Sequence, residues 1–311
     1  MPNNRAVQQL VEEFRQQRPI RAGSLIITVY GDAIATRGGT VWLGSLIKAL
    51  EPLGLNQRLV RTSVFRLAKE EWLTAEQVGR RSYYSLTGAG RRRFEKAFKR
   101  VYAPVLPDWD GQWCIVMTGQ MEQETRRPVK EELGWLGFGN IAPGVMAHPK
   151  VDLPELQATL KDLNALDDAI IFETRKQDLL NGRPLRLMVK ECWNLDALSE
   201  GYRYFLNKFR PIWQELKDAE HLYPEDCFLV RTLLIHEYRR ILLKDPQLPE
   251  ELLPSDWEGT AARLLCRNLY RLVAEKTEQH LDQILETAEG PLPNASATFY
   301  KRFGGLKTLP V

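Results

Sequence analysis

The chain has 311 residues, with 43 Lys and Arg against 40 Asp and Glu, and a formal net charge of +3. This length gives room for two or three domains that each have a core. The sequence contains neither a signal-like start nor an apolar run of about 18 residues. We therefore expect a cytoplasmic protein that does not span a membrane.

The charge is distributed unevenly along the chain. Residues 1–102 hold 18 Lys and Arg against 8 Asp and Glu, a net charge of +10. The remaining residues hold 25 against 32, a net charge of −7. We therefore expect a polyanion to bind only the first third of the chain.

The cysteines and histidines do not form the patterns of a metal or disulfide site. His236-Glu237 begins like a zinc-protease motif, but position 240 is Arg240. The cysteines are widely spaced and form no C-x-x-C pair, so we expect buried thiols: Cys114, Cys192, Cys227 and Cys266. We expect no metal, no cofactor and no catalytic residue.

The N-terminal third is predicted to begin with helices. Residues 1–20 contain a short amphipathic helix that forms an N-terminal arm, with Val7, Leu10, Val11 and Phe14 on its apolar face. Two further helices are predicted over residues 23–36 and 42–53, and Gly54 ends the second.

Residues 56–72 form an amphipathic basic helix, and Asn56 is its expected N-cap. Its apolar side carries Leu59, Val60, Val64, Leu67 and Ala68. Its other side carries Arg58, Arg61, Thr62, Phe65, Arg66 and Lys69. The acids Glu70 and Glu71 stand only at the C-terminal end. This pattern is typical of a helix that enters a DNA major groove; the alternative is a surface helix that is basic without a partner.

A hairpin with a basic tip follows the basic helix. Strands are predicted over residues 73–78 and 82–86, joined by Gly79, Arg80 and Arg81, and Thr87 caps a basic helix over residues 88–102. The order of three helices and a hairpin predicts a winged helix-turn-helix over residues 21–103. We expect Arg61 and Arg66 to read bases, and Lys69 and the two wing arginines to bind phosphates. Phe65 has two possible roles: it contacts a thymine methyl group, or it packs against the rest of the protein.

The rest of the chain predicts two further domains. Residues 104–180 hold strands at 112–118, 140–147 (broken by Pro143) and 169–174, a helix with Pro128 in its first turn and a helix at 153–163. This order indicates a ferredoxin-like module. Residues 181–311 are predicted to be all-helical, with a tail from residue 292. The predicted fold class is α+β multidomain.

The chain resembles the PaaX family of phenylacetate-degradation repressors along essentially its whole length. The resemblance rests on motifs that are not general to winged helices: Tyr30-Gly31-Asp32, Arg37-Gly38-Gly39, Trp42-Leu43-Gly44-Ser45, Phe65-Arg66-Leu67, Gly79-Arg80-Arg81-Ser82, Gly137-Phe138-Gly139, Phe209-Arg210-Pro211, Glu251-Leu252-Leu253-Pro254 and Arg302-Phe303-Gly304-Gly305-Leu306. It implies a homodimeric repressor of phenylacetate genes with a GntR-like winged helix, which binds double-stranded operator DNA and is released by phenylacetyl-CoA. It also implies that residues 181–311 form a helical domain for effector binding and dimerisation.

The middle module also resembles the small ferredoxin-like nucleases of CRISPR systems, which use an acidic residue at the end of the first strand. Here that strand ends in Met117-Thr118-Gly119-Gln120 without a carboxylate. We therefore expect a dimerisation or spacer role for this module.

An acyl-CoA effector requires cations for its phosphates and an apolar slot for its acyl end. Two groups of side chains could supply them: Tyr238, Arg239, Arg240, Lys244 and Trp257 in the first, and Arg203 and Arg210 in the second. For each residue the alternative is an ordinary salt-bridged surface or core position.

Two other classes of protein remain as alternatives. One is an enzyme acting on CoA thioesters or nucleic acid, with the winged helix as an ancillary module. The sequence has no Gly-rich phosphate loop, no G-x-S-x-G motif and no metal-ligand cluster. The other is an RNA-binding adaptor, but the aromatic signatures of an RNA-reading sheet are missing.

Overall fold

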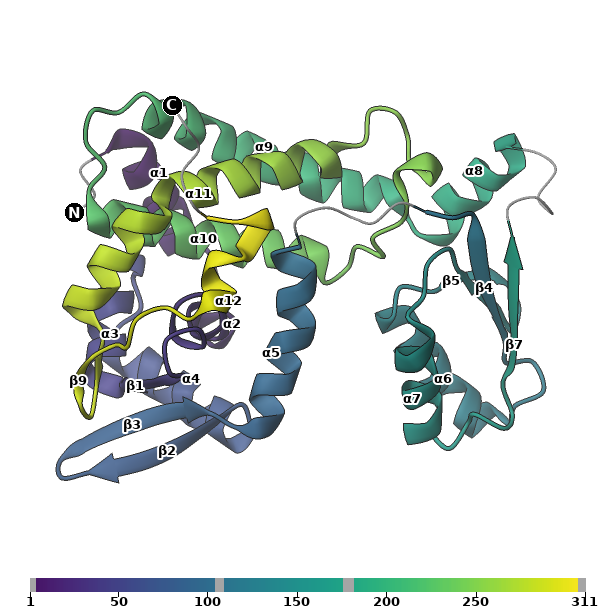
Figure 1. The fold of residues 1–311 in the computed structure, drawn as a ribbon, viewed down its shortest axis with the longest axis horizontal. Helices are drawn as coiled ribbons and strands as arrows, with labels where there is room; N and C mark the ends of the chain where they lie inside the picture. The colour runs from purple at the N-terminus through teal and green to yellow at the C-terminus, as the bar shows by residue number, and fades with distance from the viewer. Residues whose placement is uncertain (1–3, 104–108, 176–181, 307–311) are drawn as a thin grey trace. The chain divides into compact units, whose positions relative to one another are not determined.

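The computed structural model describes residues 4–103, 109–175 and 182–306, and Figure 1 presents the chain as a ribbon. The predicted mixture of helices with small sheets is confirmed. The chain forms two compact units, one of residues 1–105, 204–240 and 261–311 and the other of residues 106–203 and 241–260. Each unit combines separate parts of the chain, so the unit boundaries differ from those of the four segments predicted in chain order. None of the helices in the described ranges is both long and apolar enough to cross a membrane.

The first unit begins with the predicted arm. Helix α1 (Arg5–Gln16) buries all four predicted apolar residues, and the Asn4 side chain caps it by accepting from the amides of Ala6 and Val7. The ring of Phe14 meets the ring of His236 edge-on at 6.1 Å between centroids. The arm therefore packs within its own unit.

Three helical segments then surround the N-terminal core. They are α2 (Ala22–Val29), which continues into a π-helical turn η1 (Tyr30–Ile34), then α3 (Leu43–Leu50) with the 3-10 turn η2 (Glu51–Leu53), and α4 (Gln57–Lys69). The first two bury Leu25, Ile26, Val29, Ile34, Leu43, Leu46 and Leu50, and Ile47 is half-buried. Gly54 ends η2 with a φ of 80°, as expected of a glycine in the left-handed region.

A three-stranded antiparallel sheet in the order β1-β3-β2 completes this part. The hairpin of β2 (Leu73–Val78) and β3 (Arg81–Leu86) was predicted. Strand β1 (Thr40–Trp42) was not, because residues 40–42 give no periodic signal and pair with distant residues, Trp42 with Tyr83. The expected helix over residues 42–53 therefore begins after Trp42. Thr87 caps α5 (Gly88–Val101) by accepting from the Gly90 amide at 2.8 Å.

Three long helices supply the rest of the first unit, and the division between the units falls inside each of them: α9 (Leu195–Lys217), α10 (Pro224–Leu242) and α11 (Glu258–Ile284). A short hairpin, β8 (Glu286–Thr287) with β9 (Gly290–Pro291), follows α11. The expected tail contains regular structure up to residue 306. It forms α12 (Ala297–Tyr300) and η5 (Arg302–Gly304), and it buries Phe299 and Phe303.

The second unit holds a four-stranded antiparallel sheet in the order β5-β6-β4-β7. Its elements are β4 (Gln112–Met117), α6 (Gln123–Trp135), β5 (Gly139–Ala142), β6 (Val145–His148), α7 (Leu153–Asp162) and β7 (Ile170–Arg175). Val116 packs in one core with Val129 of α6 and Leu156 of α7. Trp113 belongs to a second core with Val189 and Trp193, at and beyond helix α8 (Gly182–Cys192).

Two predictions for this unit were wrong. Residues 140–147, predicted as one strand broken by Pro143, form a hairpin of two strands, because Pro143 and Gly144, whose φ is 73°, turn the chain back at that break. Pro128 lies inside α6 instead of in its first turn, since the helix begins at Gln123. The Arg126 guanidinium donates to the carbonyl oxygens of Thr118, Gly119 and Met121, which ties the start of this helix to the preceding loop.

A buried charge cluster joins the distant segments of the first unit. The Asp32 carboxylate lies 2.7 Å from Arg231 Nε and 3.1 Å from Arg302 Nη1. It also accepts from the hydroxyls of Tyr102 at 2.6 Å and Tyr270 at 2.8 Å. We call these five residues, all less than a tenth exposed, the Asp32 cluster. They bring together η1, the end of α5, α10, α11 and η5.

A second set of ion pairs extends the cluster. Glu278 of α11 accepts from Arg231 at 2.7 Å and from Arg37 at 3.1 Å, and Arg37 also contacts Asp282. Arg37 Nε donates to the carbonyl oxygen of Pro293 at 2.7 Å. The loop before β1 is thereby bound to the C-terminal segments.

We expect Asp32→Asn to lower the free energy of unfolding by about 3–5 kcal/mol, because two buried guanidinium groups lose their counter-charge. Urea unfolding of the full chain at neutral pH measures this. The exposed Asp167→Asn is the matched control and should change the free energy by less than about 0.5 kcal/mol. A loss below about 1 kcal/mol for Asp32→Asn would contradict the structural role of the cluster.

Acid should remove the same contribution. Burial alone would raise the pKa of Asp32, but Arg231, Arg302 and the two phenol hydroxyls outweigh it and hold that pKa below its ordinary value. Such a carboxylate stabilises the fold above its unfolded pKa of about 3.9 and loses that contribution as the pH falls. The difference in unfolding free energy between wild type and Asp32→Asn should therefore shrink below about pH 4. A constant difference down to about pH 2 would exclude this titration.

Candidate nucleic-acid interface

The outward face of α4 is where the predicted DNA-binding side chains lie. Asn56 caps the helix by accepting from the Leu59 amide at 2.9 Å, as predicted. Val60, Val64 and Leu67 are buried and fix which side of the helix faces inward. All six predicted residues on the other side are exposed: Arg58, Arg61, Thr62, Phe65, Arg66 and Lys69.

The side chains on this face make few contacts with other described residues that DNA binding would have to break. Arg66 Nε lies 3.7 Å from Glu70 Oε1, and both side chains are more than half exposed, so the pair is weak. The Thr62 hydroxyl donates to the Arg58 carbonyl oxygen at 2.9 Å. The Phe65 side chain is 64% exposed, so it does not pack in the protein interior.

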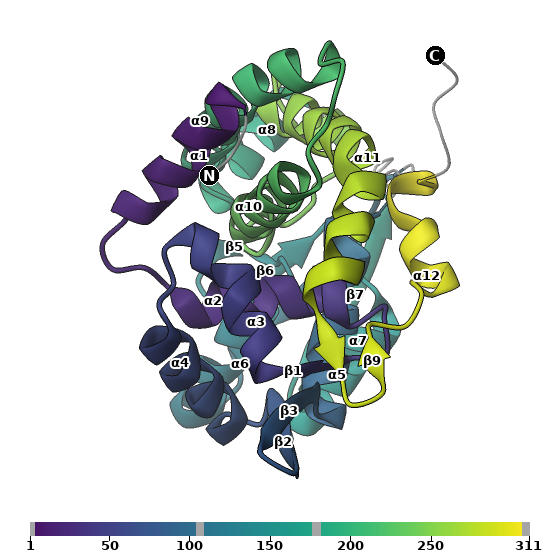
Figure 2. The same ribbon diagram turned by 90° about the vertical axis from the view of Figure 1, so that its left-hand side faces the viewer.

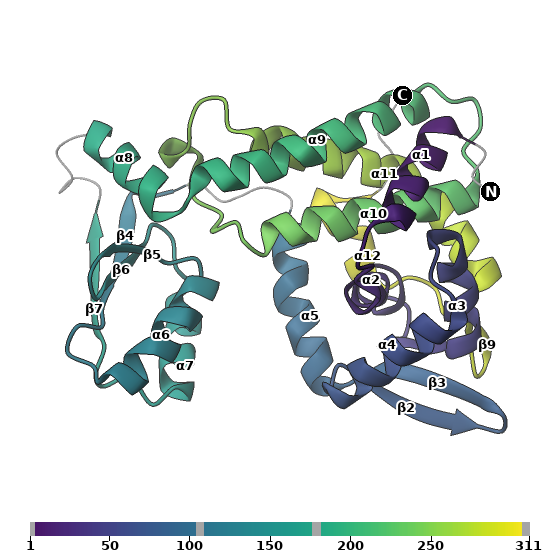
Figure 3. The same ribbon diagram turned by 180° about the vertical axis from the view of Figure 1, so that it is seen from behind.

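The hairpin lies at the same end of the first unit as α4 (Figures 2 and 3). Gly79 has a φ of 61° and makes the turn, and Arg80 and Arg81 are both exposed. Arg81 has two partners that the sequence did not suggest. Its Nη1 donates to Glu286 Oε2 at 3.0 Å, and its guanidinium lies 4.1 Å from the ring centroid of Trp42.

Further cations extend this surface along α5. Arg91, Arg92 and Arg93 are exposed. The Arg93 guanidinium lies 5.0 Å from the ring of Trp72 and donates to the Glu70 carbonyl oxygen at 3.3 Å. The surface of the first unit therefore carries cations from α4, from the hairpin and from the start of α5.

The predicted effector residues have unlike surroundings. Tyr238 is buried, and Arg239 is half-buried and donates through Nη2 to Ser24 Oγ at 3.0 Å. Arg240, the next residue, is exposed and pairs with Glu237 at 3.1 Å. These three belong to the first unit, as does the exposed Arg210.

The remaining effector candidates belong to the second unit. Lys244 is exposed, and Trp257 is half-buried with its ring 5.7 Å from that of Tyr202. Arg203 is exposed and pairs with Glu258 at 2.8 Å. Arg203 therefore has the salt-bridged surroundings that were its alternative interpretation.

Within the described part of the chain, no group of His, Cys, Asp or Glu side chains is arranged to hold a metal ion. All four cysteines are free thiols, as predicted, and only Cys192 is not fully buried. Burial raises the pKa of Cys114 to about 11 and that of Cys227 to about 12. Such thiols are poor nucleophiles near neutral pH.

The chain is similar to known proteins over nearly all of its length. Three family models match it: "PaaX-like protein" over residues 21–90, "PaaX protein central Cas2-like domain" over 106–185, and "PaaX-like protein C-terminal domain" over 193–283. It is 43% identical over 289 residues to the transcriptional repressor PaaX of Escherichia coli strain K12, covering 93% of this chain and 92% of that protein.

A solved structure is similar in fold. The uncharacterized protein Rv0674 from Mycobacterium tuberculosis superimposes with a TM-score of 0.54, covering 81% of this chain and 96% of that chain. At 20% sequence identity this likeness concerns the fold alone.

Proposed function

Because this chain belongs to the PaaX family and is a transcriptional repressor of phenylacetate catabolism, we propose that α4 and the β2–β3 hairpin form the surface that reads its operator DNA. We further propose that phenylacetyl-CoA releases the repressor from that DNA. The observation that carries the first proposal is the row of exposed cations on α4 beside an exposed basic hairpin tip.

The order of elements supports a winged helix-turn-helix. Helices α2, α3 and α4 are followed by a hairpin whose second strand pairs with β1. In such modules the last helix before the hairpin enters the major groove, and the hairpin reaches the adjacent backbone. Here α4 is that helix, and Arg80 and Arg81 stand at the hairpin tip.

The chemistry of the α4 face fits a duplex. Arg61 and Arg66 present guanidinium forks that match guanine edges, while Arg58, Lys69 and the wing arginines supply charge for phosphates. Phe65 exposes a large apolar surface among these cations. A thymine methyl group is an apolar partner that the major groove offers at that position.

A homodimer would place two such surfaces on one operator. Two-fold symmetry requires half-sites about one helical turn, or a multiple of it, apart. We propose that the second unit, whose β-α-β-β-α-β order is that of a ferredoxin-like module, serves in dimerisation or as a spacer. Its strand β4 ends at Met117 and is followed by Thr118, Gly119 and Gln120, so the acidic residue that a related nuclease would use is not in that place.

The chain is a repressor and not an enzyme, so the alternative of a CoA-thioester- or nucleic-acid-processing enzyme is set aside. For the effector, Arg239, Arg240 and Lys244 remain the proposed cations, and Tyr238 and Trp257 the proposed aromatic groups. Arg203 and Arg210 form the second proposed group.

A gel-shift experiment tests this function directly. The full chain should retard a duplex from the region upstream of phenylacetate genes at concentrations that leave a random duplex free. Phenylacetyl-CoA should reverse that shift. Equal binding to both duplexes would exclude sequence-specific repression, and a shift that phenylacetyl-CoA leaves unchanged would exclude it as the effector.

We expect Arg61→Ala to weaken operator binding by about 1–3 kcal/mol and to affect a random duplex much less, because a base contact is lost. Titration of both duplexes at one fixed salt concentration measures the difference. Arg127→Ala removes another exposed arginine, from the second unit, and is the matched control. Equal losses on the two duplexes would mean that Arg61 binds only the backbone.

We expect Glu286→Gln to strengthen DNA binding up to about fivefold at low salt. Glu286 pairs with Arg81 and adds a negative charge beside the hairpin, and an exposed pair of this kind contributes up to about 1 kcal/mol. Glu131→Gln makes the same charge change in the second unit and should leave the affinity unchanged. Weaker binding by Glu286→Gln alone would show that Glu286 positions Arg81 for DNA.

A further inference from the structure

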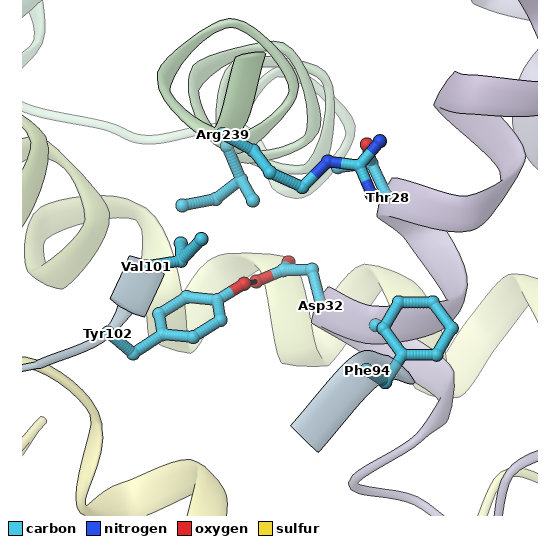
Figure 4. Close-up of a pocket in the computed structure, with 8 residues that line it drawn as sticks. Thr28, Asp32, Phe94, Val101, Tyr102 and Arg239 are labelled. Atoms are coloured by element: carbon cyan, nitrogen blue, oxygen red, sulfur yellow. Dashed lines mark hydrogen bonds between the residues drawn. The ribbon is translucent and has the colours of Figure 1, made fainter. Parts of the chain in front are cut away.

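A small pocket lies between the N-terminal helices and α10 in the first unit (Figure 4). Its walls are Thr28 of α2, Gly31 and Asp32 of η1, Phe94 and Val101 of α5, Tyr102 directly after α5, and Ile235 and Arg239 of α10. We propose that this pocket receives the arylacetyl end of the effector, with Arg239 as the donor to its carbonyl oxygen. This proposal rests on the proposed function, and it assigns a site and a mode of release to the effector.

The walls match an apolar group that carries one acceptor. Phe94, Val101 and Ile235 present hydrocarbon and aromatic surface to the space. Arg239 is the cation in the wall, and the Asp32 carboxylate in the wall is already bound by two guanidinium groups and two phenol hydroxyls. A single guanidinium suits one carbonyl or carboxylate, whereas the several phosphates of a nucleotide need several cations. The pocket therefore fits the aryl end of a thioester and not its CoA end.

The Arg239 guanidinium has one N–H donor that makes no hydrogen bond to the described residues. Its Nη2 donates to Ser24 Oγ at 3.0 Å and to the Ser24 carbonyl oxygen at 3.3 Å. Its Nε is buried and has no acceptor among the described residues. A buried donor left without a partner costs about 1–3 kcal/mol, which an acceptor on a ligand would remove. Arg240, one residue further, has its partner in Glu237 and does not line the pocket.

Because the pocket is small, ligand binding requires a wall of the pocket to move. The cavity measures about 20 Å³, which is room for about one water molecule. A phenyl ring enters only if a wall moves. Phe94 and Tyr102 are the walls from α5 and the residue after it, and Phe94 packs so closely on Gly31 that a Cβ at position 31 would collide with it.

Tyr102 connects this wall to the Asp32 cluster. Its hydroxyl donates to Asp32 at 2.6 Å, and Figure 4 displays the two side chains meeting beside the pocket. A ring that displaces Tyr102 weakens this contact and shifts α5 against η1. A ligand that binds better to the shifted arrangement favours it, and the α2, η1 and α5 segments of the proposed DNA-binding module lose their positions. Operator release follows from that shift.

The test compares two arginines, one in the pocket and one outside every proposed site. Arg239→Gln and Arg127→Gln each remove one cation, and only the first removes the pocket donor. In a gel shift with operator DNA, Arg239→Gln should need at least about 10-fold more phenylacetyl-CoA for half-release, while Arg127→Gln should stay within about twofold of wild type. Free phenylacetate and CoA are added in parallel to separate the possible sources of the arylacetyl group.

The outcomes separate this site from the proposed function. Release of wild type and of both variants at the same phenylacetyl-CoA concentration would overturn the pocket and leave the effector in place. Release of wild type by CoA alone would also overturn it. Release by phenylacetate at a comparable concentration would support the pocket with the free acid as ligand. A wild-type complex that phenylacetyl-CoA does not release overturns both proposals.

Hydrogen exchange of the wild-type protein gives a readout that does not depend on the folding of a variant. Phenylacetyl-CoA should slow amide exchange in peptides from α10 around Ile235 and speed it in peptides around η1 and the end of α5. Unchanged exchange in all of these peptides at saturating ligand would overturn the pocket, whatever the variants do.

Discussion

The first unit depends on one buried carboxylate. Asp32 stands between two guanidinium groups, from Arg231 and Arg302, and it also accepts from two phenol hydroxyls. Charges removed from water are stable in a protein interior only when they are paired and hydrogen-bonded. The cluster therefore requires its five contributing segments to be in place at once, although Asp32 and Arg302 are 270 residues apart in the chain.

This requirement has a consequence for regulation. The segments that carry the proposed DNA-reading face belong to the same compact unit as the larger parts of the three long C-terminal helices. The loop before β1 is bound to α11 through Arg37 and Glu278, and the hairpin is bound to the residue after α11 through Arg81 and Glu286. A change in the C-terminal helices can therefore reach the N-terminal module through side-chain contacts.

Sequence reasoning succeeded where the determining forces are local. Helix α4 was predicted because its N-cap, its apolar stripe and the glycine that ends the preceding helix all act within a few residues. The hairpin was predicted because its strands and its turn are adjacent. Strand β1 was missed because three residues give no period, and its partner Tyr83 lies about 40 residues away.

The Asp32 cluster was not predicted from the sequence, for a related reason. Asp32, Arg231 and Arg302 give no sign in the sequence that they are buried, because single charged residues are usually exposed. The anchored C-terminal segment was missed with them, since Phe299 and Phe303 stand in a stretch rich in turn residues. For the candidate site, the exposed residues of α4 followed from the helical period, while the partners of Arg81 came from distant parts of the chain.

The most direct measurement is cleavage of operator DNA from a fixed point on α4. An iron chelate tethered to Thr62→Cys would lie at the centre of the exposed face, and the wild-type chain treated with the same reagent is the control for the native thiols. The account predicts two groups of cuts on the operator, separated by about one helical turn or a multiple of it. A cleavage pattern identical to that of the control would contradict the placement of α4 in the groove.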